Sequence, residues 1–324
     1  MNILILAPDT DEHASSVILE LKRRGHKVMQ VEGGNFPRKD QLSIRLSSNR
    51  SGLVIRQSDD LVDLSNFDTI WRRRGEKPVI DNSNIHSDDQ DFAQNEARAA
   101  AIGLRDISDF GTARWVNPRA AADQIENKPF QLRLAQSLGI PIPDTLISND
   151  PVEISEFYNH HNMRVIYKPL TPPKFEEAGE TLITFVNMLP KDVAEDADLL
   201  KLTPGIYQPY LDKIFEIRVN VFDKQILSTR IDNQDVEGAE IDWRSKVVST
   251  RLTSFQLPEW LEKRILIFME KAGLVFGALD FVVRNNGDFV FLEVNQMGQF
   301  LWLDSLQDTS KHLNAMCDML SMTA

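Results

Sequence analysis

The chain has 324 residues with a formal net charge of −12, 42% hydrophobic and 26% charged residues, and a single cysteine. This length predicts two or three domains, and one cysteine excludes an internal disulfide framework or a cysteine-rich zinc site. The negative charge argues against a nucleic-acid binder. Because no apolar run could span a bilayer and no signal-peptide pattern opens the chain, we expect a cytoplasmic protein with no membrane partner.

The first third of the chain has the pattern of an open α/β domain. Residues 2–7 form an apolar run typical of a buried strand, residues 14–24 have apolar side chains at helical spacing, and residues 27–32 predict a second strand. No G-x-G-x-x-G follows the first strand, so a dinucleotide site is not supported there. A strand at residues 69–72 leads into three arginines, 72–74, which are either a binding feature or a solvated surface.

Two lysines stand out in the middle of the chain. Lys128 lies in residues 119–138, which predict one long helix, and Lys168 lies near the end of the apolar strand 165–169. Because no Walker-type phosphate loop is present, separate lysines are the candidates for holding phosphates. Alternatively, Lys168 extends into solvent and Lys128 lies on a solvated helix face. The polar stretch 171–179 is equally consistent with a lid and with a hairpin tip.

Arg218 lies in the predicted strand 215–222, on the same face as Glu216 and Asn220. This strand is expected to form a hairpin with residues 225–231. An arginine in an apolar strand usually has a carboxylate or phosphate partner, because its planar fork matches both. The partner of Arg218 is therefore either Glu216, in a structural pair, or a bound phosphate.

Residues 277–303 carry the strongest functional signal. They read as two apolar strands joined by Asn286-Gly287, a typical two-residue hairpin turn. With that turn, Asp280 lies directly opposite Glu293, and Asn295 projects from the same face because side chains alternate along a strand.

Two carboxylates that face each other repel, unless a pKa shift or a cation relieves the repulsion. Two carboxylates and an amide oxygen suit a hard ion such as Mg²⁺, whose shell phosphates often complete. The alternative is a polar, solvated sheet face. Val282, Phe289 and Phe291, which the same register places on this face, argue against full solvation.

On these residues the chain resembles an ATP-grasp ligase over nearly its full length. The D…E-x-N pattern of Asp280, Glu293 and Asn295 is specific to the superfamily. Within it, the chain is most similar to the maturases of graspetides, the microviridin-type ribosomal peptides. That resemblance rests on TIWRRR, ENKPFQLRLAQSLGIPIPDTLISNDP, FEIRVNVF, IDWR and EVNQMGQFLWL. One departure is Gln296, where these enzymes often have proline.

The resemblance implies an α/β fold in three parts, with an N-terminal domain at residues 1–117, a central lid domain at 118–205 and a C-terminal metal-binding domain at 206–324. The residues implied to contact ATP are Lys128, Lys168, Gln208, Tyr210, Leu211 and Glu216. Those implied to bind Mg²⁺ are Asp280, Glu293 and Asn295. The implied catalytic residues are Arg218 and Arg244, and the implied substrate contacts are Arg73, Arg74 and Asp242.

The activity implied is phosphorylation of an Asp or Glu side chain in a precursor peptide by ATP. A Ser or Thr hydroxyl or a Lys amine then closes a macrocyclic ester or amide. The expected partner is a ribosomal precursor with a leader, docked near residues 180–203, and an acidic, Ser/Thr-rich core; a homodimer is also expected. Two alternatives stay open: a ligase that joins an amino acid to a protein tail or small acid, and a non-catalytic nucleotide- or peptide-binding module.

Overall fold

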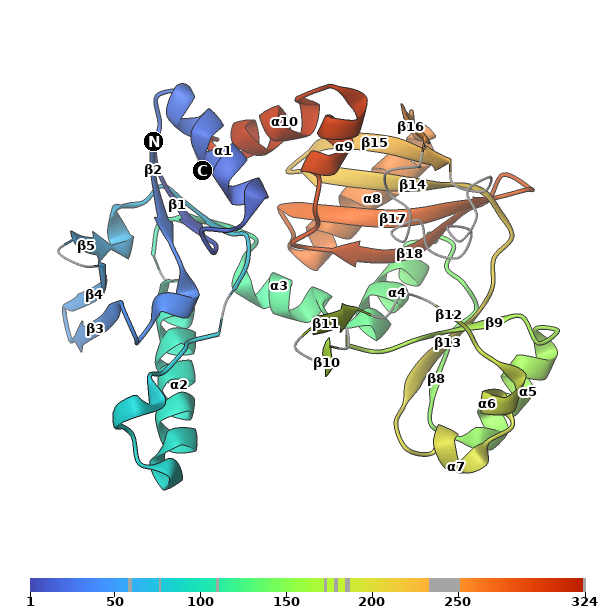
Figure 1. Cartoon of the computed structure of the whole chain (residues 1–324). Coiled ribbons are helices and arrows are strands. Elements are labelled where there is room, and N and C mark those ends of the chain that lie inside the picture. Colours follow the sequence, from blue (N-terminus) through green and yellow to red (C-terminus); the bar gives the residue numbers. More distant parts are fainter. Residues whose placement is uncertain are drawn as a thin grey trace.

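The computed structural model describes residues 1–57, 60–75, 77–108, 111–171, 174–177, 180–183, 187–232 and 251–322. Within these ranges the chain forms three units of sheet and helix (Figure 1). The N-terminal unit lies on the left of the figure, the central unit at the lower right and the C-terminal unit at the upper right. The mixed α/β class expected from the sequence is confirmed.

The N-terminal unit is built on a parallel sheet with the strand order β2-β1-β6-β7. Its strands are β1 (Asn2–Leu6), β2 (Lys27–Val31), β6 (Thr69–Arg72) and β7 (Arg114–Val116). Helix α1 (Glu12–Arg23) covers one face; Asp11 caps it by accepting a hydrogen bond from the Ala14 amide, and Val17 and Leu21 are buried. The predicted βαβ opening is confirmed.

The other face of this sheet meets a second, antiparallel sheet and a long helix. The strands are β3 (Gln41–Ser47), β4 (Arg50–Gln57) and β5 (Asp60–Asp63), and the helix is α2 (Gln90–Ser108). Leu4 of β1, Ile55 of β4 and Trp115 of β7 share one buried cluster, so the two sheets enclose a common core. Helix α2 extends below this core in Figure 1.

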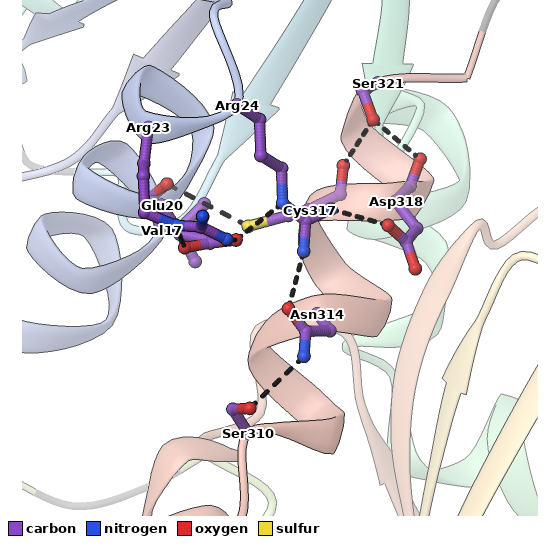
Figure 2. Close-up of polar contacts among 9 residues, drawn as sticks. All are labelled: Val17, Glu20, Arg23, Arg24, Ser310, Asn314, Cys317, Asp318 and Ser321. Carbon is purple, nitrogen blue, oxygen red and sulfur yellow. Dashed lines mark hydrogen bonds and ion pairs between the residues drawn. The ribbon is translucent and has the colours of Figure 1, made fainter.

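The C-terminal helix α10 (Lys311–Leu320) packs against α1, which joins the two ends of the chain (Figure 2). Arg24 donates to Glu20, Asp318 and Asn314, at 2.7, 2.5 and 2.5 Å. Beneath this polar layer the Cys317 thiol lies 3.9 Å from the Val17 carbonyl, and burial raises its pKa to about 12. The buried neutral thiol is therefore part of the interface core.

The central unit contains the antiparallel sheet β12-β9-β13-β8 and a separate hairpin. The strands of the sheet are β8 (Leu146–Ser148), β9 (Val165–Lys168), β12 (Asn187–Met188) and β13 (Gly205–Pro209). Its helices are α5 (Pro151–His160), α6 (Lys191–Ala194) and α7 (Ala197–Leu200). The hairpin pairs β10 (Lys174–Glu177) with β11 (Glu180–Ile183), so part of the predicted polar loop 171–179 is a strand.

Two shorter helices replace the long helix predicted for residues 119–138. They are α3 (Arg119–Ile125) and α4 (Lys128–Ser137). Asn127 caps α4 by accepting a hydrogen bond from the Phe130 amide at 3.0 Å, and Pro129 occupies the first turn. The single-helix prediction is wrong because an N-cap and a proline start a new helix inside a continuous apolar pattern.

The C-terminal unit is a five-stranded antiparallel sheet with the order β16-β15-β14-β17-β18. Its strands are β14 (Lys213–Phe222), β15 (Gln225–Asp232), β16 (Arg251–Ser254), β17 (Phe276–Arg284) and β18 (Phe289–Asn295), and its helices are α8 (Glu259–Ala272) and α9 (Leu301–Gln307). Side chains from α3, α4 and α8 share one core with β14, β17 and β18. Among the described residues, no helix is long and apolar enough to cross a membrane.

Candidate functional site

Three charged side chains form a row across the C-terminal sheet. Arg218 of β14 lies opposite Asp280 of β17, and Asp280 lies opposite Glu293 of β18. Arg218 Nε is 3.1 Å from Asp280 Oδ1, and both side chains are only 6% exposed. The ladder therefore holds two carboxylates beside one guanidinium, and the predicted pairing of Asp280 with Glu293 is confirmed. Asp280 is thus a partner of Arg218 that the sequence, which offered Glu216 or a phosphate, did not predict.

The turn of this hairpin differs from the predicted turn. The Gly287 amide donates to the Arg284 carbonyl and the Arg284 amide to the Asp288 carbonyl, which makes residues 285–287 a three-residue loop. Gly287 adopts a positive φ of 84°, as such loops require. The predicted two-residue turn is wrong by one position.

A β-bulge at Leu292 compensates for this shift, because Phe281 pairs with Phe291 whereas Asp280 pairs with Glu293. The extra residue returns Glu293 to the face of Asp280. It also turns Phe291 and Phe289 toward the hydrophobic core, with Phe291 fully buried. Their predicted place on the carboxylate face is therefore wrong.

The next row of the same face contains two amides around a small residue. Asn220 of β14 and Asn295 of β18 both lie opposite Ala278 of β17. Asn295 is exposed, and its Oδ1 accepts a hydrogen bond from the Met297 amide at 3.0 Å. Gly298 packs so tightly that a Cβ there would lie 2.3 Å from the Ala278 Cβ. The turn after β18 therefore fixes Asn295 beside the charged row.

Two buried amides from outside the sheet hold this hairpin in place. The Gln131 side chain of α4 accepts from the Val294 amide at 2.9 Å and donates to the Val294 carbonyl at 3.0 Å. The Asn117 Oδ1 accepts two amide hydrogen bonds at the start of β17, and its Nδ2 donates to the carbonyls of Phe276 and Gln296. All four hydrogen-bonding positions of Asn117 are thus used on segments that flank the predicted metal ligands.

Sequence reasoning missed both of these amides. The one signal for Asn117 was a polar side chain directly after a buried strand. Gln131 had no such signal, because it lies within an amphipathic helix.

Lys128 contacts the residue after Lys168, although the two lysines are 40 positions apart. Lys128 Nζ donates to the Pro169 carbonyl at 3.0 Å, directly after Lys168 at the end of β9. Both side chains are partly buried. A side chain held by a backbone carbonyl of the neighbouring unit is not freely solvated. This argues against the alternative that Lys128 lies on a solvated helix face.

The predicted adenine contacts lie at the end of β13. Gln208 is buried, and its Nε2 donates to the Thr145 hydroxyl at 3.0 Å. Tyr210 and Leu211 follow the strand; the Tyr210 amide donates to the Arg164 carbonyl, and the Arg164 guanidinium lies over the Tyr210 ring. Glu216 is buried further along and pairs with Lys213 at 2.7 Å. Gln208, Tyr210 and Leu211 therefore lie where the chain leaves β13 for the C-terminal sheet, and Glu216 lies in β14, the next strand.

The predicted substrate arginines lie beyond the carboxyl ends of β1 and β6. Arg73 is buried, with Nε 3.3 Å from Asp11 Oδ1, and Arg74 is half-exposed, with Nε 3.1 Å from Asp11 Oδ2. Arg73 also donates to the Met297 carbonyl at 2.7 Å, two residues after Asn295. Burial, together with both arginines and despite Asp11, lowers the pKa of nearby His13 to about 4. We call Asp11, His13, Arg73 and Arg74 the N-terminal crevice.

Asp242 and Arg244, predicted to contact substrate and to act in catalysis, lie outside the described residues. Within the described ranges, no cluster of three His, Cys, Asp or Glu side chains could hold a metal ion. A metal at the charged row would therefore use Asp280 and Glu293 together with amide or non-protein oxygens.

Comparisons with known proteins bear on the fold of the chain. A family model described as the MvdD pre-ATP-grasp domain matches residues 2–123. The solved structure of a Chryseobacterium gregarium RiPP-associated ATP-grasp ligase, in complex with ADP and a leader and core peptide, is 25% identical with a TM-score of 0.90; the match covers 98% of this chain and 96% of that chain. The chain has an ATP-grasp fold.

Two macrocyclases from Microcystis aeruginosa show the same fold. MdnC, bound with the precursor peptide MdnA, is 25% identical with a TM-score of 0.86, and the match covers 99% of this chain and 100% of MdnC. MdnB is 25% identical with a TM-score of 0.82, and the match covers 99% of each chain. Comparison with curated protein sequences gives no match. The resemblance to peptide-modifying ATP-grasp ligases is confirmed, whereas the domain limits and the role of each site residue stay predictions.

Proposed function

We propose that this protein is an ATP-dependent ligase that activates side-chain carboxylates of a ribosomally made peptide and links them to other side chains of that peptide. The observation that carries the proposal is the row of Arg218, Asp280 and Glu293 across three strands, close to Asn295. Its support from relatives is that one similar ligase was solved with ADP and a leader and core peptide, and a similar macrocyclase with its precursor peptide.

The residues present fit Mg·ATP. Asp280 and Glu293 face each other on one ladder, and a hard, oxygen-ligated cation relieves the repulsion between them. Asn295 supplies an amide oxygen one row away. Lys128 and Lys168 both lie near the carboxyl end of β9, where they would hold phosphate oxygens. Gln208, Tyr210 and Leu211 would line the adenine, with Glu216 nearby. Bound Mg·ATP supplies the phosphoryl group that activates the carboxylate.

The chain's own part in the reaction is to place charge where it develops. Arg218 lies beside Asp280 in a buried ion pair, and its guanidinium is a planar fork that matches phosphate oxygens. From that position it would stabilise negative charge on the acyl phosphate as the nucleophile attacks. Arg244 is the second proposed catalytic residue.

The proposed nucleophiles are Ser or Thr hydroxyls, which give esters, and Lys amines, which give amides. Attack at the acyl carbon breaks the bond between this carbon and the bridging phosphate oxygen. Phosphate is released, and it takes up the proton of the nucleophile. The peptide would carry a leader and an acidic, Ser/Thr-rich core. Arg73, Arg74 and Asp242 are the proposed contacts to this peptide. We also propose a cytoplasmic homodimer.

Mass spectrometry of a precursor peptide after incubation with the protein and Mg·ATP tests the proposal. Intramolecular ring closure removes one water per link, whereas joining a free amino acid adds its residue mass. Glu293→Gln should be inactive in the same assay, and Asp288→Asn, a matched change at the exposed hairpin turn, should retain activity. A peptide whose mass stays constant while ADP forms, or loss of water without ATP, would refute the proposed ligation.

A further inference from the structure

A cavity of about 540 Å³ lies inside the N-terminal unit. Its floor is apolar and contains Leu4, Leu42, Ile55, Leu64 and Trp115, from both sheets. Helix α2 closes one side with Ala101 and Ile102. This volume lies within the usual range of ligand pockets, roughly 300–1,000 Å³, and a mostly apolar lining is typical of them.

The mouth of the cavity is positively charged. Arg72, Arg74, Lys77 and Arg98 line it, against two carboxylates, Glu32 and Asp40. Asp40 is buried and accepts a hydrogen bond from Gln57, and the four basic side chains outnumber the two acids. An incompletely packed core gives an apolar void, but it gives no reason for four basic side chains at the opening. The lining therefore fits a ligand with an apolar part and a negative part.

The floor also contains a donor without an acceptor. The indole Nε1 of Trp115 is buried and has no hydrogen-bond partner among the described residues. A buried N–H left unpaired costs about 1–3 kcal/mol, which a carbonyl or hydroxyl oxygen in the cavity would recover. This favours an occupant with polar atoms, as a peptide has, over a pure hydrocarbon.

The position of the cavity connects it with the charged row. In the strand order β2-β1-β6-β7, the chain leaves β1 on one face and returns to β6 from the other, and such a switch point is where open α/β sheets bind ligands. Arg74 lines the cavity and pairs with Asp11 at that point. Arg73, the next residue, donates to Met297 in the turn after Asn295. The cavity mouth and the predicted metal ligands are thus linked through consecutive residues.

We propose that this cavity binds the substrate peptide next to its reacting residues, with an aliphatic or aromatic side chain in the floor and a carboxylate at the mouth. This inference rests on the proposed function, because activation of side-chain carboxylates requires a peptide that carries them. Charge complementarity selects an acidic segment, and the apolar floor selects one that also has a large hydrophobic residue.

Two full-length variants test the cavity. Ala101→Trp places the largest side chain into it from α2, and Arg98→Glu inverts one charge at its mouth. Lys22→Glu is the matched charge control, since Lys22 is exposed on α1, across the sheet from the cavity. Thermal melting establishes that each variant is folded, and the charge variant keeps the test intact if Ala101→Trp fails to fold.

The first probe is 1-anilinonaphthalene-8-sulfonate, whose rings and sulfonate match the two features of the lining. We expect saturable fluorescence with the parent protein and about tenfold weaker binding in both cavity variants, the size of one lost anchoring contact. The peptide that the parent protein dehydrates should displace this dye. Its KM should rise about tenfold in both variants with the KM for ATP nearly unchanged, and Lys22→Glu should match the parent.

Two results would overturn the inference. One is ring closure by the parent protein with an unchanged peptide KM in both cavity variants. The other is dye binding that the peptide does not displace. In either case the proposed ligase function would stand, because ring closure by the parent is measured separately. Absence of any peptide modification by the parent would remove both.

Discussion

The charged row of the C-terminal sheet and the N-terminal crevice both hold buried charge, but they hold it differently. In the row, strand register places Arg218, Asp280 and Glu293 side by side on three adjacent strands. In the crevice, Asp11 at the N-cap of α1 meets Arg73, which follows β6 and lies far from it in the sequence. The row has an excess of carboxylate and suits a cation, whereas the crevice has an excess of arginine and suits an anion. The two meet at Met297.

Arg218→Lys should have the largest effect and would show whether the row is catalytic. Lysine keeps a charge beside Asp280, so ATP affinity and melting temperature should stay close to those of the parent. Without the planar fork, kcat should fall by roughly 10²–10³, as when one transition-state donor is removed. Arg230→Lys is the control, since Arg230 pairs with Asp232 on the neighbouring strand. A large drop in melting temperature with near-normal turnover would make Arg218 structural.

Asn117→Ala tests whether the row depends on the N-terminal unit. The change removes four hydrogen bonds and leaves buried backbone groups unpaired, so we expect the free energy of unfolding to fall by about 3 kcal/mol. Asn127→Ala, which removes only a helix cap, should cost about 1 kcal/mol. Chemical denaturation measures both. Equal losses would mean that the hairpin is held without Asn117.

The sequence predicted which residues form the row, but not the turn and the bulge that align them. Asp280 and Glu293 were paired correctly because a turn one residue longer than expected and the bulge at Leu292 cancel. Alternation alone cannot reveal a bulge, and for the same reason Phe291 was placed on the wrong face. The α/β class and the strand that carries Lys168 were also predictable, since both depend on local patterns.

The partners could not be predicted, because they come from distant segments. Nothing in FEIRVNVF indicates that Arg218 pairs with a carboxylate 62 positions later. Asp11 has the local pattern of a helix cap, but its ion pairs with Arg73 and Arg74 arise from the order of strands in the sheet. The break before Lys128 was visible as Asn127 and Pro129, and was missed because the apolar pattern continues across it.

His13 gives a pH test of the crevice. Burial beside Arg73 and Arg74 lowers its pKa to about 4. When the pH falls below the ordinary pKa of histidine, this side chain therefore takes up a proton in the unfolded chain but not in the folded chain. Stability is therefore lost through this group between about pH 6.5 and pH 4, by about 2 kcal/mol at pH 5. Between pH 7.5 and pH 5, the free energy of unfolding of His13→Gln should fall by about 2 kcal/mol less than that of the parent, as measured in denaturant titrations. Parallel pH profiles for the two proteins would show that the crevice does not hold His13 neutral.

Lys168→Ala should have the smallest effect. Removing one charge from a phosphate cradle should raise the KM for ATP by about tenfold and leave kcat for bound substrate nearly constant. Lys201→Ala, at an exposed position of the same unit, serves as the control. Unchanged nucleotide affinity in calorimetry would return Lys168 to the solvent-exposed alternative and confine the phosphate contacts to Lys128.

The most direct test of the row as a metal site is a Mg²⁺ titration of ADP binding, measured by calorimetry for the parent and for Glu293→Gln. The amide removes a metal ligand and also removes the repulsion from Asp280, so the variant should melt at or above the parent temperature. We expect Mg²⁺ to strengthen ADP binding strongly in the parent and at least about tenfold less in Glu293→Gln, with Asp288→Asn behaving as the parent. Equal Mg²⁺ dependence in all three proteins would contradict the assignment of this row as the metal site.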